Sequence, residues 1–200
     1  MSVGFNFPEN QRHDGLYKAI LHAYDKNVVM FAAASNDGNM AGDGLQGINY
    51  PARDPHVFCV HSADGYGNTS SYNPRAVYGE DNFSFLGQSV CSAWPKYIGA
   101  KGTVDAEDGT GTWKYSSGTS VATPVAASIA ALVLQFGETR KKYIDRHKKL
   151  RSHQGMRQLL AQMAEKESWD GFRNIRPWNV LQSRDEEKTL NSFNTALNKI

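Results

Sequence analysis

The stretch YSSGTSVATPVAASIAALVLQF, residues 115–136, joins a polar segment to a long apolar run. From about residue 119 onward, apolar side chains recur at the 3.6-residue spacing of a helix with one buried stripe. They are Val121, Val125, Ile129, Leu132, Val133 and Phe136. A hydroxyl side chain at 116, 117 or 119 fits a helix cap, and Pro124 is tolerated near a first turn. The pattern predicts a helix over about 119–136 and leaves open whether Ser120 has a chemical role.

The residues before this helix alternate between strand-like and helix-like patterns. The apolar segment MSVGF, residues 1–5, predicts a strand, and residues 10–27 predict a helix. The continuous apolar run VVMFAAAS, residues 28–35, is typical of a strand buried on both faces. Further strands are expected over 56–63 and 89–93. Strand, helix and strand in this order predict an α/β fold with a mostly parallel sheet.

The composition changes beyond Gly137. Residues 138–153 are strongly charged and fit either a solvated helix or a mobile linker. Residues 155–167 have the spacing of an amphipathic helix, and residues 185–200 predict a terminal helix. We therefore divide the chain into residues 1–136, which carry the α/β pattern, and a charged helical extension over 137–200.

The overall composition narrows the possible partners. With 22 basic and 20 acidic residues the net charge is only +2, so the overall charge does not indicate a nucleic-acid partner. No secretory signal is visible and no apolar stretch approaches ~20 residues, so the sequence predicts a soluble protein without a membrane partner, cytoplasmic or of unknown location. Cys59 and His61 share one face of a predicted strand, but His56 does not, so no metal site is expected. No cofactor is expected either.

The heptapeptide Gly118-Thr119-Ser120-Val121-Ala122-Thr123-Pro124 resembles the serine motif of the subtilisin-like serine peptidases, or subtilases. The resemblance implies that Ser120 is a nucleophile whose own N–H, at the positive end of a helix, donates to an oxyanion. VVMFAAASND resembles the subtilase strand that ends in the oxyanion-hole asparagine, which implies that role for Asn36. Taken alone, Asn36 fits equally well a polar residue that opens a turn.

The resemblance extends to a substrate cleft. MSVG resembles the strand that pairs with the substrate backbone, which implies that Ser2, Val3 and Gly4 bind substrate. On the opposite wall of the primary specificity pocket the resemblance places Ala33, Ala34 and Ser35. It covers residues 1 to about 136, and the tail, with GMRQLLAQM and IRPWNVL, loosely resembles fungal subtilase-like domains. The fold implied is the three-layer subtilisin-like α/β fold, truncated at its N-terminus.

Several positions depart from the family pattern. Ser35 and Ser128 stand where glycine is usual, and Ala93-Trp94-Pro95 occupies the place of an Ala-Pro-Gly turn. More seriously, the family needs an aspartate in a D-[ST]-G turn and a histidine in an H-G-T-x-V-A helix, and neither motif occurs in these 200 residues. His13 and His22 are expected on a helix surface rather than as replacements for the base.

The resemblance implies a serine-type endopeptidase that forms an acyl-enzyme on a polypeptide substrate. Without an adjacent base a serine hydroxyl is a poor nucleophile near neutral pH. An alternative is therefore a catalytically inactive subtilase-like domain that binds peptides or proteins. The implied partners are a polypeptide substrate and the missing N-terminal half of the same domain. Because subtilases sometimes build calcium sites from loop carbonyls, a structural calcium ion remains compatible with the sequence.

Residues 1–200 produced alone are expected to associate or to express poorly. The family resemblance implies that neighbouring strands lie outside this sequence, which leaves an unpaired sheet edge beside the apolar run over 28–35, and such edges promote aggregation. Sedimentation velocity at several concentrations measures this association. A monodisperse monomer that unfolds cooperatively would contradict the expectation.

Overall fold

The computed structural model describes residues 1–5, 14–38, 47–95, 103–105, 112–182 and 184–200. Four strands form a wholly parallel sheet, as the sequence predicted, in the order β1-β2-β3-β7. Their bounds are Phe31–Ala33 for β1, Phe58–Ala63 for β2, Phe83–Leu86 for β3 and Arg173–Asn174 for β7. The register pairs Ala32 with Cys59 and Ser62 with Phe85. Because all four strands run the same way, their carboxyl ends meet at one edge of the sheet.

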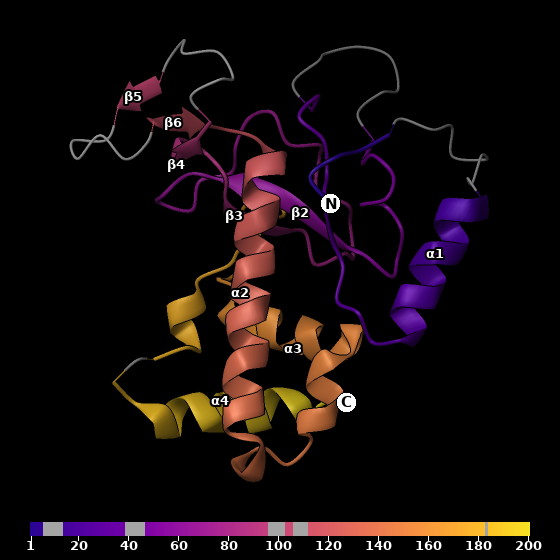
Figure 1. Ribbon diagram of the computed structural model, residues 1–200, viewed down its shortest axis with the longest axis vertical. Helices are drawn as coiled ribbons and strands as arrows, with labels where there is room; N and C mark the ends of the chain where they lie inside the picture. Colours follow the sequence, from indigo (N-terminus) through magenta and orange to yellow (C-terminus); the bar gives the residue numbers. More distant parts are fainter. Residues whose placement is uncertain (6–13, 39–46, 96–102, 106–111, 183) are drawn as a thin grey trace.

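Helices cover both faces of this sheet, which confirms the predicted three-layer α/β arrangement. The long helix α2 (Thr119–Thr139) lies across one face, where Phe31 joins the larger core cluster (Figure 1). Its neighbour along β1, Ala32, points to the other face and packs with Ile20 of α1 (Asp14–Asp25). Successive residues of a strand face opposite sides, so these two contacts place α1 and α2 on opposite faces.

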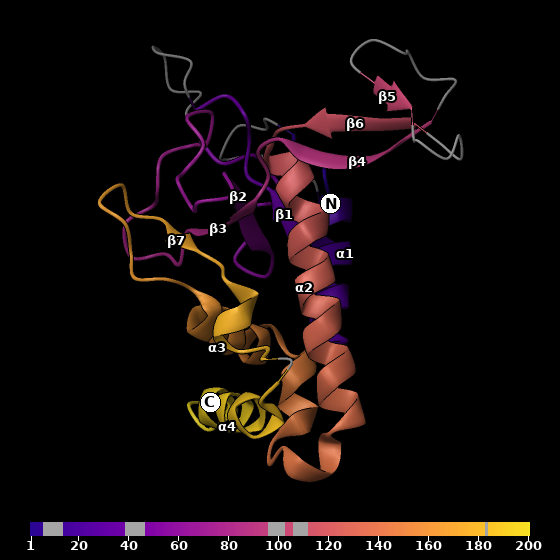
Figure 2. The ribbon, with the colours of Figure 1, turned by 90° about the vertical axis from the view of Figure 1, so that its left-hand side faces the viewer.

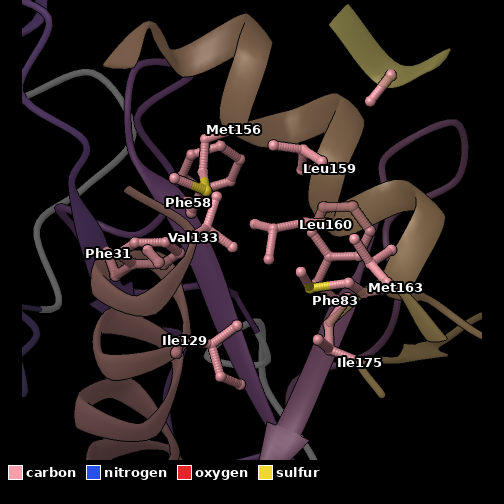
Figure 3. Packing of buried hydrophobic residues seen from close by; sticks show 14 of the residues in the cluster. Phe31, Phe58, Phe83, Ile129, Val133, Met156, Leu159, Leu160, Met163 and Ile175 are labelled. Carbon is pink, nitrogen blue, oxygen red and sulfur yellow. The ribbon is translucent and has the colours of Figure 1, made fainter. Parts of the chain in front are cut away.

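The C-terminal third packs into the same core as α2. Helix α3 (His153–Met163) buries Met156, Leu159, Leu160 and Met163 against β1–β3 and α2, as Figure 3 shows. Helix α4 (Glu186–Leu197) adds Phe193, Ala196 and Leu197 to the same cluster. The charged segment before α3 forms the short 3₁₀ helices η1 (Lys141–Tyr143) and η2 (His147–Arg151), and a third, η3 (Pro177–Asn179), follows β7. One hydrophobic core therefore spans both sides of the predicted boundary at residue 136.

A second, antiparallel sheet projects from the body beside the start of α2 (Figure 2). It consists of β4 (Val90–Trp94), β6 (Thr112–Ser116) and β5 (Thr103–Asp105), with β6 in the middle. Of these strands only β4 was predicted. Ala93, within the strand predicted over 89–93, and Trp94 both belong to β4, where they pair with Trp113 and Thr112.

The strand predicted over residues 1–5 does not form. Only its ends contact the sheet region: the Met1 carbonyl accepts from the Ala33 N–H at 3.1 Å, and Phe5 forms an isolated bridge with Tyr50. Side chains of residues 1–5 are exposed, so the segment lacks the burial on both faces that stabilises a parallel strand.

The expectation that no apolar stretch reaches ~20 residues is also wrong, because α2 is by length and composition apolar enough to cross a membrane. Its inner face is nevertheless packed on the strands, as in the core helix of a soluble protein.

Gly155→Ala is expected to lower the free energy of unfolding by about 1–3 kcal/mol, the usual range for overpacking. A Cβ on Gly155 would lie 2.1 Å from the Lys149 carbonyl oxygen, so η2 or α3 must move. Gly15→Ala in α1 is the matched control, because a Cβ there meets nothing within 4 Å and helix propensity predicts a gain of up to ~1 kcal/mol. Urea unfolding of both variants measures the difference. Equal free energies for wild type and Gly155→Ala would show that this contact does not constrain the fold.

Candidate active site

The first turn of α2 leaves one backbone donor unused. The N–H of Gly118 donates to the Gly87 carbonyl at 2.8 Å, and the N–H of Thr119 donates to Oδ1 of Asn36 at 2.8 Å. The Val121 N–H bonds back to the Gly118 carbonyl at 3.0 Å. Within the described ranges, the N–H of Ser120 is the remaining donor of this turn and has no partner. A free N–H at a helix N-terminus is a ready site for negative charge.

Asn36 lies beside this donor because β1 ends just before it. Its Oδ1 accepts from the Thr119 N–H and from the Thr119 hydroxyl, at 2.8 and 3.1 Å, so the orientation of the amide is fixed. The Nδ2 group is then directed away from Thr119 and toward Ser120. A Cβ placed on Gly118 would lie 3.2 Å from Asn36 Nδ2 and 3.2 Å from Ser120 Oγ. The amide donor and the serine hydroxyl therefore border the same space in front of Gly118.

Glycine is required at the residue before the helix. Gly118 has φ = 148°, a backbone conformation that side chains rarely adopt. The space that a side chain would take is the space between the Asn36 amide and the Ser120 hydroxyl. Any larger residue at 118 would both strain the backbone and enter the only gap in which these polar groups meet.

The residues predicted to bind substrate fall into two groups. Ala33, Ala34 and Ser35 are buried, and their backbone groups are engaged: the Ala34 N–H bonds to the Val60 carbonyl at 3.0 Å. They hold Asn36 in place by ending β1 directly before it. Ser2, Val3 and Gly4 are exposed, with 58% of Val3 accessible, and lie between the two contacts that Met1 and Phe5 make. The structure thus unites Ser120 with Asn36 and keeps residues 2–4 open to solvent.

No histidine of the described chain contacts Ser120. His61 is fully buried in β2, where its Nε2 lies 3.4 Å from the Cys59 thiol and its ring packs edge-on against Phe172. Burial lowers the pKa of His61 to about 4, and burial together with nearby Arg157 lowers the pKa of His153 to about 4. His22 is exposed on α1 as expected, while His13 lies outside the described residues.

A cavity of about 560 Å³ opens at the other end of the sheet. It is lined by the amino ends of β2 and β3, including Phe58 and Phe83, whereas Asn36 follows the carboxyl end of β1. Within the described residues no group of three or more His, Cys, Asp or Glu side chains is arranged to hold a metal ion. Cys59 and His61 do share a face, as predicted, and burial raises the pKa of the Cys59 thiol to about 12. Their 3.4 Å contact is that of a protonated thiol with a neutral imidazole.

Gly87 is the site residue that the sequence did not reveal. A Cβ there would lie 2.7 Å from the Ala122 Cβ, 2.7 Å from Ser62 Oγ and 2.9 Å from the Gly118 carbonyl oxygen. The absence of a side chain lets the carboxyl end of β3 touch the first turn of α2.

Comparisons with known proteins agree on one family. Residues 1–193 match the model of the subtilase family. Thermitase of Thermoactinomyces vulgaris is 32% identical over 128 residues, which cover 64% of this chain and 38% of that protein. The subtilisin-like protease het-Q2 of Podospora anserina is 30% identical over 138 residues, or 68% of this chain and 33% of that protein. The chain thus spans about a third of the length of these curated relatives.

Solved structures show the same fold. The prenylagaramide maturation protease PagA matches with a TM-score of 0.66 and 22% identity, over 90% of this chain and 58% of that one. The patellamide maturation protease PatA matches with a TM-score of 0.64 and 23% identity, over 100% of this chain and 62% of that one.

The buried His61 and the half-buried His153 predict that stability is lost in mild acid. The folded-state pKa of His61 is lowered from 6.5 to about 4, so between these values the unfolded chain binds a proton that the folded chain does not. Stability is then fully present above about pH 6.5 and falls as the pH approaches 4, by up to ~3 kcal/mol at about 1.4 kcal/mol per pKa unit.

His61→Leu should flatten this dependence, although His153 leaves part of it because its pKa is lowered in the same direction. The exposed His22→Gln serves as the control. Unfolding free energies measured in urea at pH 7 and pH 5 test the prediction, and an identical pH dependence for wild type and His61→Leu would refute it.

Proposed function

Because the chain belongs to the subtilase family, we propose that it forms the nucleophile side of a serine endopeptidase site. The Ser120 hydroxyl oxygen attacks the carbonyl carbon of a peptide bond, and an acyl-enzyme forms as the amine leaves. The Ser120 N–H and the Asn36 Nδ2 group donate to the oxyanion that develops on the substrate carbonyl. The observation that carries this proposal is that the Asn36 amide and the Ser120 hydroxyl border the same space in front of Gly118, while the Ser120 N–H has no partner within the described residues.

Activation of Ser120 requires a base that this sequence does not contain. The attacking hydroxyl must lose its proton, and an unassisted serine hydroxyl does so poorly near neutral pH. D-[ST]-G and H-G-T motifs are absent from the 200 residues, and the curated relatives are about three times as long as the region matched. We propose that the aspartate and histidine come from polypeptide beyond these residues, as an N-terminal half of the same domain.

The substrate proposed is a polypeptide held in extended form. Ser2, Val3 and Gly4 are exposed and their segment runs beside β1, so their backbone groups are accessible for pairing with a peptide. The buried residues Ala33, Ala34 and Ser35 are proposed to back the primary specificity pocket rather than to line it with mobile side chains. No cofactor takes part in this chemistry, and calcium, if bound, would have a structural role.

One observation favours a second candidate function. Three described histidines are held elsewhere: His61 is buried and His153 half-buried, both with a lowered pKa, and His56 pairs with Asp54 at 2.8 Å beside the distant cavity. A chain that works alone would then keep a peptide-binding cleft and an oxyanion hole but would not hydrolyse its ligand. This alternative is an inactive subtilase-like domain that binds peptides or proteins.

Labelling with diisopropyl fluorophosphate, followed by peptide mass spectrometry, separates the two functions. We expect slow modification of Ser120 in the chain alone and faster modification after addition of a polypeptide that carries the D-[ST]-G and H-G-T motifs encoded upstream. Asn36→Leu should slow the reaction by about 10²–10³, the usual loss for one oxyanion donor, a range that itself comes from a subtilisin.

Ser120→Ala should abolish the adduct, and Ser128→Ala, which removes an exposed hydroxyl on the same helix, should leave it unchanged. No adduct on Ser120 with either preparation would exclude the endopeptidase. Binding of a peptide by the unlabelled protein would then support the binding module.

A further inference from the structure

Tyr72 links the two segments that carry Ser120 and Asn36. It lies half-buried in the connection between β2 and β3. Its phenolic oxygen donates to the Gly87 carbonyl at 3.2 Å, and that carbonyl also accepts the Gly118 N–H at 2.8 Å. The backbone carbonyl of Tyr72 accepts the N–H of Gly38 at 3.0 Å, and Gly38 comes two residues after Asn36. Tyr72 therefore bonds directly to Gly38, two residues after Asn36, and to the Gly87 carbonyl, which in turn holds Gly118 before Ser120.

The phenol belongs to a chain of hydroxyl groups with one consistent direction. Tyr72 Oη lies 2.8 Å from Ser62 Oγ, which in turn accepts from Ser70 Oγ at 3.0 Å. With the Tyr72 hydrogen directed to the Gly87 carbonyl, the Ser62 hydroxyl donates to Tyr72 Oη, while the Ser70 hydrogen has two acceptors within reach, Ser62 Oγ and Gln88 Oε1 at 3.2 Å. Such a chain is mutually polarised, and each link strengthens the next. The Gly87 carbonyl is its final acceptor.

The support for Tyr72 is rigid. The next residue, Asn73, forms a two-way bond with the backbone of Ser62: its Oδ1 accepts the Ser62 N–H at 2.9 Å and its Nδ2 donates to the Ser62 carbonyl at 2.7 Å. Gly38 approaches so closely that a Cβ there would lie 1.7 Å from the Asn73 carbonyl oxygen. Neither loop can shift without breaking buried contacts to β2.

We propose that Tyr72 is a positioning residue that fixes the separation of the Asn36 amide and the Ser120 N–H. The inference rests on the proposed function, because the two donors must face one substrate oxygen together. Tyr72 touches neither substrate nor Ser120. It acts by holding Gly38 and Gly87, the neighbours of the two donor segments, at a set distance from one another.

The test is Tyr72→Phe, which removes only the phenolic oxygen and keeps the backbone bond to Gly38. The matched control is Tyr78→Phe, because Tyr78 is 104% exposed and its hydroxyl makes no hydrogen bond within the described chain. Amide hydrogen exchange of the full chain, followed by NMR, should show the Gly118 and Thr119 amides exchanging roughly two- to tenfold faster in Tyr72→Phe, the factor that one lost hydrogen bond produces. The Tm should fall by no more than ~4 °C.

Labelling of Ser120 by diisopropyl fluorophosphate supplies the second readout, and we expect it to slow between roughly tenfold and a hundredfold. Tyr78→Phe should match wild type in both measurements. Unchanged exchange at Gly118 and Thr119 would overturn the proposal. So would faster exchange that is uniform across β2 and α3, because Tyr72 would then be merely structural. Normal labelling despite faster local exchange would overturn it too.

The exchange measurement also separates this inference from the proposed function. If wild type is never labelled but Tyr72→Phe still loosens the Gly118 and Thr119 amides selectively, the positioning role stands and the endopeptidase role fails. Ser62→Ala provides an independent variant, because it removes the hydroxyl that lies 2.8 Å from Tyr72 Oη. It should loosen the same two amides, and protection equal to wild type would contradict the hydroxyl chain.

Discussion

The candidate site depends on the close approach of the first turn of α2 to the carboxyl ends of β1 and β3. Two glycines permit this approach: Gly87 leaves no side chain between β3 and Ala122, and Gly118 leaves none between Asn36 and Ser120. The Gly118 N–H and the Gly87 carbonyl then bond directly at 2.8 Å. Every other feature of the site, including the orientation of the Asn36 amide, follows from having these backbones in contact.

This contact is held by the whole core and not only by the loops around it. The inner face of α2 packs through Ile129 and Val133 against Phe31, Phe58 and the residues of α3 (Figure 3). Further along the helix, Gly137 lies so near Leu150 that a Cβ would meet its Cδ2 at 2.0 Å. Helix α2 is therefore held at both ends, by the sheet at Gly118 and by Leu150 of η2 near Gly137. The packing contacts of α2 therefore continue through Ile129, Val133 and Gly137, beyond the 118–124 motif.

Sequence patterns predicted the parts of the fold that repeat a simple period or a rare motif. The helical stripe from Val121 to Phe136 and the apolar run before Asn36 identified α2 and β1, because burial on one or both faces leaves a strong signal. The strands β3, β5, β6 and β7 are short, and their pairing is decided by partners distant in sequence, such as Arg173 beside Phe83. A two- to five-residue strand has too few positions to show a period, so tertiary contacts decided these elements.

The residues of the candidate site also differ in whether the sequence alone could reveal them. The motif around Ser120 and the position of Asn36 at a strand end were accessible from sequence, whereas the dependence on Gly87 and Tyr72 was not. The Tyr72 phenol and the Gly118 N–H both donate to the backbone carbonyl of Gly87, and a carbonyl is present at every position, so no residue type in the sequence marks this contact.

Geometry and activation are consequently separable in this chain. The proposed oxyanion donors, the Asn36 amide and the Ser120 N–H, lie among contacts that join segments 36–38, 62–73, 87 and 118–120, all of which lie within the 200 residues. Proton removal from Ser120 uses none of those contacts, since it needs only a base that reaches Oγ from the open side. A fold can therefore keep an ordered oxyanion hole whether or not the base is present, because the hole is stabilised by the packing of α2 on the sheet.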